Sequence, residues 1–362
     1  MHMKFEPIAL SLVGAFTAAL VITASFNPPK SETASPRGNF PRGGLEDAEL
    51  LSLPDGVSPQ DGSAAAEDRA TAGTDLALAI DAGAELPDFT VASGAVGGSA
   101  HALSNAFGAM GYHFDKVVAG EVRVPRMFLT SLPGDIAKVA ENKDRKALFF
   151  RSVLPLVLQV NEEIQADRKR LWKLRYQVRV GNNVHAADRL WLDVMTERYR
   201  IKPRSRADDI DALIARVDVV PPSLALAQAA EESGWGTSRF VREGNALFGQ
   251  WTFGDQDNGL IPRGREAGKT HRIKAFATLT DSVRAYVRNI NTHRAYRDFR
   301  KTRAVIRRQG GVLDGWLLAG RLTSYSQRGP AYVAALRGLI DANGLQRLDD
   351  ARLDGDKDGA SI

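Results

Sequence analysis

The chain contains no cysteine among its 362 residues. This absence excludes disulfide bonds, thiolate metal sites, cysteine nucleophiles and a lipid-modified N-terminal cysteine. Aromatic residues make up only 7%, and the six histidines are dispersed without the spacing of metal ligands. The sequence also has no phosphate-binding glycine loop, Ser-His-Asp arrangement or nucleotide-binding motif. We therefore expect neither a metal nor a cofactor.

What remains is an ordinary globular composition, with 44% hydrophobic and 25% charged residues. The length suffices for one large or two modest domains. Lys4 precedes an uncharged, mostly apolar run at residues 8–24, IALSLVGAFTAALVITA. Residues 1–26 are therefore expected to be a signal peptide cleaved after Ala24 or an uncleaved anchor in the inner membrane. Either outcome places the protein in the periplasm, anchored or secreted.

Residues 27–100 are rich in Gly, Ala, Ser, Pro and Asp, and this composition predicts a disordered acidic linker. Residues 27–99 hold 4 basic and 12 acidic side chains. Because residues 1–26 are neutral and the whole chain carries +5, residues 100–362 must carry +13. Such a basic domain is attracted to peptidoglycan and to anionic lipid head groups. The expected export and the lack of a binding motif beside the basic runs argue against nucleic acid.

Helical periodicity dominates from residue 101 onward, and residues 101–220 are expected to form an accessory helical region. Within it, a long helix at residues 147–180 is predicted to break near Pro155. Ser223 is a candidate N-cap for the helix that follows. A β-hairpin is predicted at residues 255–275, and a disordered tail at residues 347–362. Further helices are predicted at residues 183–199, 207–217, 279–294, 296–308, 311–318 and 330–342.

The most informative stretch is residues 224–251, LALAQAAEESGWGTSRFVREGNALFGQW. A helix of small and apolar residues runs into Glu231 and Glu232, and a Ser-Gly-Trp-Gly turn follows at once. A second glycine-rich, aromatic-bearing turn comes at residues 244–249. Sugar hydrolysis requires a partly shielded acid, a flat apolar surface for a pyranose face and room for the glycan. A carboxyl group at a helix end, beside an indole and bare backbone, supplies all three.

This stretch resembles the glucosaminidase domain of glycoside hydrolase family 73, whose core motif is close to AQAxxESGWG…NxFG. The wider sequence is most similar to the Bax-type group of Gram-negative bacteria over residues 114–345, including VPRMFLTSLP at 124–133 and LPLVLQVNEEI at 154–164. The resemblance implies an α+β, mainly α fold, with a lysozyme-like core and a small β-hairpin lobe at residues 221–346. It also implies an endo-β-N-acetylglucosaminidase that cuts the GlcNAc–MurNAc strands of peptidoglycan.

The family motif assigns the general acid to the residue before Ser-Gly-Trp-Gly, which is Glu232. Glu231 is a departure, because relatives often carry an uncharged residue there, and it stays open as an alternative acid. We expect burial beside Trp235 to raise the pKa of Glu232. The resemblance places a second carboxylate on the hairpin lobe, where Glu266 is the best match. Asp255, Asp257 and Glu243 are the reserve candidates, and the acetamido oxygen of the substrate is an alternative to all of them.

The resemblance also suggests substrate-binding residues. Trp235 is expected to stack on a sugar ring or to support the turn as a core residue. Asn245 is expected to bind an N-acetyl group or to cap a turn, within the Asn-x-Phe-Gly element that ends in Phe248 and Gly249. Tyr296 and Tyr325 fall where relatives carry cleft tyrosines. Tyr332 falls there too but is expected to be part of the core.

Two other functions stay open from the sequence. A lytic transglycosylase of the same fold needs only one acidic residue, and its products carry 1,6-anhydro ends. A non-catalytic peptidoglycan-binding or scaffold protein would retain the fold without releasing fragments. The arginine-rich residues 294–308 are expected to be a solvated helix face, with contact to glycan or lipid as the alternative.

Overall fold

A computed structural model describes residues 98–253, 258–263, 265 and 270–355 of the chain. The predicted membrane segment at residues 8–24 and nearly all of the predicted linker lie outside these residues. Within the described ranges, no helix combines the length and the apolar character that crossing a bilayer requires. The first described helix is α2 (Ala100–Ala109). Its N-cap is Ser99, whose hydroxyl accepts a hydrogen bond from the Ala102 backbone N–H.

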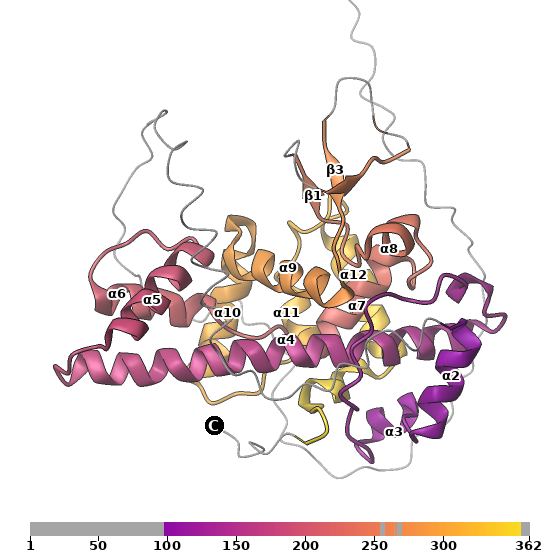
Figure 1. Cartoon of the computed structure of the whole chain (residues 1–362), viewed down its shortest axis with the longest axis horizontal. Helices are drawn as coiled ribbons and strands as arrows, with labels where there is room; N and C mark the ends of the chain where they lie inside the picture. Colours follow the sequence, from indigo (N-terminus) through magenta and orange to yellow (C-terminus); the bar gives the residue numbers. More distant parts are fainter. Residues whose placement is uncertain (1–97, 254–257, 264, 266–269, 356–362) are drawn as a thin grey trace, which may run out of the picture. The chain divides into compact units, whose positions relative to one another are not determined.

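Helix α4 (Asn142–Arg179) is 38 residues long and forms the base of the fold (Figure 1). It continues through Pro155, so the predicted break near that residue is wrong. A proline removes one backbone hydrogen bond and costs about 3 kcal/mol in a helix interior. All of residues 148–161 are buried, and their packing outweighs that cost. The other helices before the site are α3 (Phe114–Ala119), η1 (Ile136–Lys138), α5 (Ala186–Arg198) and α6 (Arg206–Arg216).

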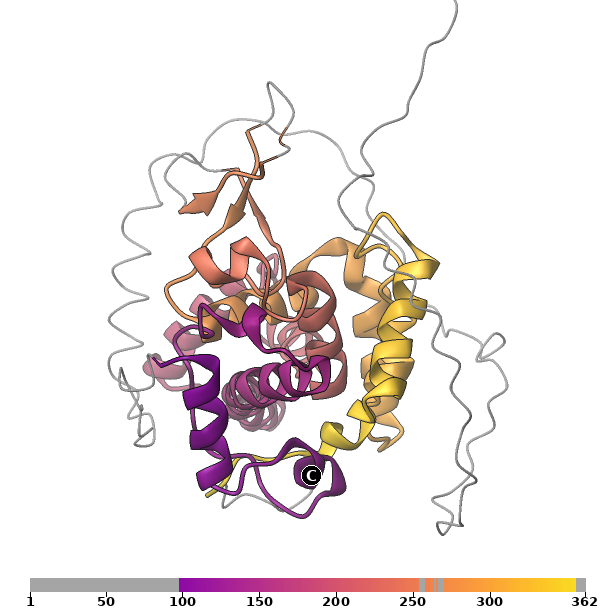
Figure 2. The same ribbon diagram turned by 90° about the vertical axis from the view of Figure 1, so that its right-hand side faces the viewer.

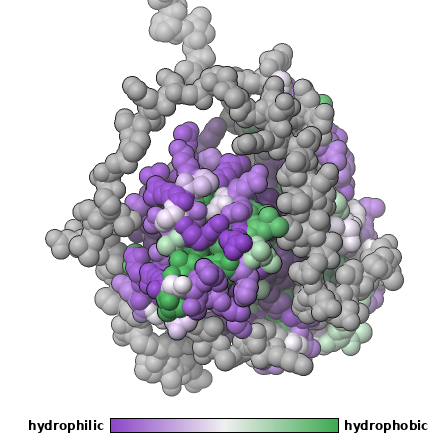
Figure 3. Space-filling view, turned by 60° about the vertical axis from the view of Figure 1, so that its left-hand side comes forward, coloured by the Kyte–Doolittle hydropathy of each residue, from purple (hydrophilic) through white to green (hydrophobic). Residues whose placement is uncertain are grey.

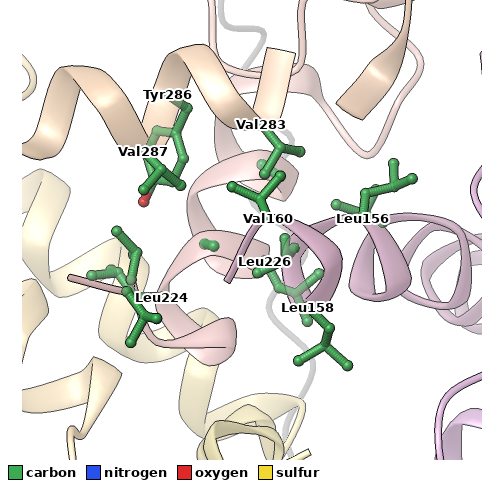
Figure 4. Close-up of a cluster of buried hydrophobic side chains, with 14 of the residues drawn as sticks. Leu156, Leu158, Val160, Leu224, Leu226, Val283, Tyr286 and Val287 are labelled. Atoms are coloured by element: carbon green, nitrogen blue, oxygen red, sulfur yellow. The ribbon is translucent and has the colours of Figure 1, made fainter. Parts of the chain in front are cut away.

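Helix α7 (Pro222–Ser233) lies at the centre of the helical packing, and residues 222–230 are all buried. It begins at Pro222 with Pro221 at the N-cap position, so the predicted N-cap at Ser223 is wrong; proline fits the first turn, where no backbone donor is needed. It packs against α4, α11 (Gly315–Ala319) and α12 (Pro330–Ala342), while α9 (Leu279–Thr292) packs on α4 (Figure 2). Figure 4 shows Leu156 and Val160 of α4, Leu226 of α7 and Val283 of α9 in one apolar cluster.

The β lobe is a small antiparallel sheet above the helices. Its strands are β1 (Trp251–Thr252), β2 (Gly259–Leu260) and β3 (Arg272–Lys274), in the order β1-β3-β2. Trp251 pairs with Ile273, and Leu260 pairs with Ile273 from the other side. Helix α8 (Arg239–Gly244) contacts β2. The predicted fold class, mainly helical with a small β lobe, is confirmed.

The arginine-rich segment forms η2 (Arg294–Tyr296) and α10 (Arg297–Arg308). It is not simply a solvated face, because Arg303 is 1% exposed and donates to the backbone oxygens of Asp218 and Val219. Helices α5 and α6 lie on the left of Figure 1. From that side, Figure 3 shows mainly hydrophilic residues around a smaller apolar area.

The predicted disordered tail at residues 347–362 is wrong for residues 347–355, which are folded. Helix η3 (Leu345–Asp350) packs on α7, and Leu348 and Leu353 are fully buried. Leu353 also pairs with Val124 in a parallel bridge. Two leucines anchor a segment that is otherwise polar, and their burial offsets the entropy of ordering it. Residues 356–362 lie outside the described part.

Candidate functional site

Helix α7 ends in a tight left-handed turn directly after Glu232. Gly234, Trp235 and Gly236 all have positive φ, at 57°, 60° and 77°. A side chain on Gly236 would put its Cβ 2.5 Å from Leu132 Cδ1, so glycine is required there. The left-handed conformation costs about 1–2 kcal/mol at Trp235, which is not a glycine. The surrounding packing holds this strained turn in place, and the turn fixes the chain beside the two glutamates.

Trp235 packs against α4. Its ring meets Phe149 and Phe150 edge-on, with centroids 6.0 and 5.2 Å apart, and Lys146 Nζ lies 4.7 Å from the ring centroid. These contacts favour the second of its two predicted roles, support of the turn as part of the core. Stacking of a sugar on Trp235 stays a prediction.

Glu232 is half-buried and has one strong hydrogen-bond donor. The Tyr332 hydroxyl, on α12, donates to Glu232 Oε1 at 2.8 Å. Burial raises the pKa of Glu232 above its ordinary value, although the Tyr332 hydrogen bond lowers it in part. The neighbouring charge of Glu231 raises it further, and Arg328 lowers it. The expected rise is therefore present, and it is caused by desolvation. A carboxyl group with a raised pKa is suited to donating a proton near neutral pH.

Three side chains form a chain of hydrogen bonds that ends at the Glu232 carboxylate, and each one donates to the next. The Tyr286 hydroxyl donates to Gln228 Oε1 at 2.6 Å, and Gln228 Nε2 donates to the Tyr332 hydroxyl at 3.0 Å. Because that hydroxyl already accepts from Gln228, its own proton points to Glu232. Gln228 and Tyr286 are fully buried. The chain of hydrogen bonds therefore fixes Glu232 Oε1 as an acceptor.

Glu231 has different surroundings from Glu232. It pairs with Arg328 at 2.5 Å, and its side chain is 26% exposed. The Glu231 carboxylate is therefore occupied by a guanidinium, whereas Glu232 accepts from a neutral tyrosine hydroxyl. The structure thus separates the two adjacent glutamates, which the sequence alone did not.

The Asn-x-Phe-Gly element also lies at this site. Gly249 has a φ of 59°, and a Cβ built on it would lie 3.9 Å from Glu232 Oε2. Phe248 is buried and stacks on Tyr286 with a centroid distance of 3.9 Å, so it holds the hydrogen-bond chain and is not open to substrate. Asn245 ends α8 in the left-handed region and donates to the backbone oxygens of Phe276 and Ala277. Asn245 therefore has the capping role that was one of its two predicted roles, and binding of an N-acetyl group stays a prediction.

Three tyrosines line up beside the acid. The rings of Tyr296 and Tyr325 are 5.7 Å apart, and those of Tyr325 and Tyr332 are parallel at 5.5 Å. Tyr332 is 1% exposed, as expected of a core residue, and it also contacts Glu232. The resemblance placed Tyr332 among the cleft tyrosines, but a hydrogen bond between residues 100 positions apart leaves no local pattern in the sequence.

The second carboxylate is not located. Glu266, Asp255 and Asp257 lie outside the described residues. Glu243 pairs with Arg239 at 3.0 Å on the exposed side of α8. In the part of the chain that is described, no three His, Asp or Glu side chains converge to hold a metal ion.

The chain is similar to known proteins over several of its described helices and its β lobe. The model of the Glucosaminidase family, described as mannosyl-glycoprotein endo-beta-N-acetylglucosaminidase, matches residues 207–345. The chain is also 34% identical over 224 residues to Protein bax of Escherichia coli (strain K12), covering 60% of this chain and 76% of that protein. No solved structure matches. The family match begins within α6 and includes α7, α8, the β lobe and the tyrosines beside Glu232.

Proposed function

Since this chain belongs to the family of Bax-type glucosaminidase-domain proteins and is a glycan-cleaving peptidoglycan hydrolase, we propose that Glu232 is its general acid. The surroundings of the Glu232 carboxyl group support this proposal. Glu232 is the half-buried carboxyl at the end of the motif helix, its pKa is raised by burial, and one of its oxygens is fixed by Tyr332. We propose further that the enzyme is an endo-β-N-acetylglucosaminidase, which cleaves the glycosidic bond after N-acetylglucosamine inside the glycan strand.

The two oxygens of Glu232 have different roles in this mechanism. Oε1 accepts a hydrogen bond from the Tyr332 hydroxyl, so the acidic proton resides on Oε2, on the side of Gly249. Oε2 transfers that proton to the glycosidic oxygen as the bond from this oxygen to the anomeric carbon breaks. The positive charge that develops at the anomeric carbon is stabilised by Glu266 or by the acetamido oxygen of the substrate. Water then adds to the anomeric carbon and gives its proton to Glu266, or to the Glu232 carboxylate where the acetamido oxygen has acted.

We also propose that the enzyme acts in the periplasm, anchored in the inner membrane by residues 8–24 or secreted after cleavage. The uncharged run supports this location. The charge of +13 over residues 100–362 supports attraction to a negatively charged cell wall.

The test of the acid is Glu232→Gln, which keeps the shape and removes the proton. Release of soluble fragments from purified sacculi should fall by about 10²–10⁴-fold. The matched control is Glu231→Gln, the same change one residue earlier, which should keep most of the activity. Undiminished digestion by Glu232→Gln would disprove the assignment.

A lytic transglycosylase is the second candidate, because Glu232 is the one described carboxyl in contact with the tyrosines, and such an enzyme needs one acid. Mass spectrometry of the released fragments separates the two reactions. Hydrolysis leaves free reducing ends, whereas 1,6-anhydro ends would identify a transglycosylase. A protein that binds sacculi and releases no fragments would be a scaffold.

A further inference from the structure

We propose that Trp251, on strand β1, is a stacking platform for one sugar ring of the bound glycan strand. This subsite rests on the proposed function, since it assumes that a glycan strand crosses Glu232. The role of platform was predicted for Trp235, but that ring packs against Phe149 and Phe150 with Lys146 near its centroid. The exposed tryptophan of the motif is the last residue of the same segment.

Trp251 is 60% exposed, and its neighbour Phe253 is 64% exposed. Single exposed apolar side chains are common on protein surfaces and need no explanation. Here two large aromatic rings lie together, with centroids 6.2 Å apart and an edge-on angle of 68°. Exposed apolar clusters mark binding surfaces more often than isolated residues do. The pair stands on a lobe whose sheet is too small to bury either ring.

The indole of Trp251 is held in a fixed orientation. The His271 imidazole stacks on it with a centroid distance of 4.5 Å and an interplanar angle of 19°. This stack covers one face of the indole, and the high exposure leaves the opposite face open to solvent. A flat, open aromatic face matches the apolar C–H face of a pyranose ring. Because the indole is already ordered, binding costs little additional entropy.

The platform is also close to the acid along the chain. Trp251 follows Gly249 by two residues, so their Cα atoms are at most ~7.6 Å apart. A Cβ on Gly249 would lie 3.9 Å from Glu232 Oε2. A polymer with one glycosidic bond at Glu232 therefore has a neighbouring sugar within reach of the lobe. The chemical class of ligand is a β-linked amino-sugar chain, bound through the face of a ring.

The test measures binding separately from cleavage. Full-length protein carrying Glu232→Gln is titrated with soluble glycan fragments from digested sacculi, and binding is followed by calorimetry. Adding Trp251→Ala should weaken binding about tenfold, equivalent to about 1.4 kcal/mol, while Trp251→Phe should recover part of the loss. The matched control is Trp172→Ala, because Trp172 is 45% exposed near the C-terminal end of α4, away from the motif. It should leave affinity unchanged.

The outcomes are distinct. Unchanged affinity in Trp251→Ala would overturn the subsite, and so would an equal loss in Trp172→Ala. A loss in Trp251→Ala that Trp251→Phe does not reduce would also count against ring stacking. A thermal melt of each variant separates lost binding from lost folding, and Phe253→Ala is the second variant if Trp251→Ala is unstable. Failure of the general acid instead appears as residual cleavage by Glu232→Gln, which this binding assay does not measure.

Discussion

Helix α7 has a shielded carboxylate near each end, Asp218 before its first turn and Glu232 in its last. Burial on its own would raise the pKa of both carboxyl groups. At Asp218 this effect is outweighed by Arg303, Arg168 and Arg307, and the pKa of Asp218 falls below its ordinary value. At Glu232 one tyrosine hydrogen bond and the more distant Arg328 do not outweigh it, and the pKa stays raised.

This difference separates a carboxylate held among several arginines from one with a single tyrosine donor. Asp218 is 3% exposed, and it pairs with Arg307 at 3.1 Å and with buried Arg303 at 3.7 Å. Asn291 completes the cluster by donating to the Asp218 backbone oxygen and accepting from Arg303. A carboxylate surrounded in this way stays ionised at neutral pH. Glu232 has fewer charged partners, so burial leaves its ionised form less stable and it can bind and release a proton more easily.

The largest expected loss of stability comes from removing the C-terminal segment whose Asp349 is hydrogen-bonded to the N-terminal end of α7. Asp349 accepts hydrogen bonds from the Ser223 backbone N–H and hydroxyl, both at 2.8 Å, and from the Gly315 N–H at 2.9 Å. Deleting residues 347–362 removes these bonds and the buried Leu348 and Leu353. Each leucine contributes about 2–5 kcal/mol, a large part of a typical stability of about 5–15 kcal/mol.

We expect the truncated protein to be unfolded or nearly so by circular dichroism and urea denaturation. The matched control deletes only residues 356–362 and should denature like the full chain. If both truncations were equally stable, the folded segment at residues 347–355 would contribute nothing to α7.

The next effect is at Asp218. The change Asp218→Asn leaves Arg303 buried without its charge partner, and breaking a buried pair costs about 3–5 kcal/mol. Since the folded pKa of Asp218 is depressed, its contribution is present above the unfolded pKa of about 3.9 and is lost as pH falls through the lower folded value. The difference in unfolding free energy between wild type and Asp218→Asn should therefore be full near neutral pH and shrink in acid.

Urea denaturation at several pH values measures this difference. The control is Asp211→Asn, because Asp211 is 47% exposed and pairs with Arg175 on the surface. Exposed pairs contribute about 0–1 kcal/mol. A small, pH-independent loss in Asp218→Asn would mean that the arginine cluster is stable without its carboxylate.

The sequence indicated the residues at the C-terminal end of α7 but not the contacts at its N-terminal end. Glu232, the turn at residues 234–236 and Gly249 lie in one continuous motif, so local pattern located them. The partners of Asp218 and Asp349 come from distant segments, and such contacts depend on packing that local pattern does not encode. The tail was misjudged because only Leu348 and Leu353 interrupt its polar composition. The Pro155 break was misjudged because burial outweighed propensity.

The smallest effect tests the hydrogen bond that tunes Glu232. Tyr332→Phe removes the donor to Oε1, which stabilises the ionised carboxylate, so the pKa of Glu232 should rise further. A hydrogen bond to a charged group is worth about 1.5–3 kcal/mol, so its loss should move the pKa by an amount that a pH profile resolves. In the proposed mechanism activity requires protonated Glu232, so the limb of kcat/KM that falls with rising pH should move to higher pH. Tyr325→Phe, which keeps the ring stack and the Tyr332 hydroxyl, should leave the limb in place. A limb that stays fixed or moves to lower pH in Tyr332→Phe would show that Glu232 does not govern it, and the contrast between the two ends of α7 would then be one of stability alone.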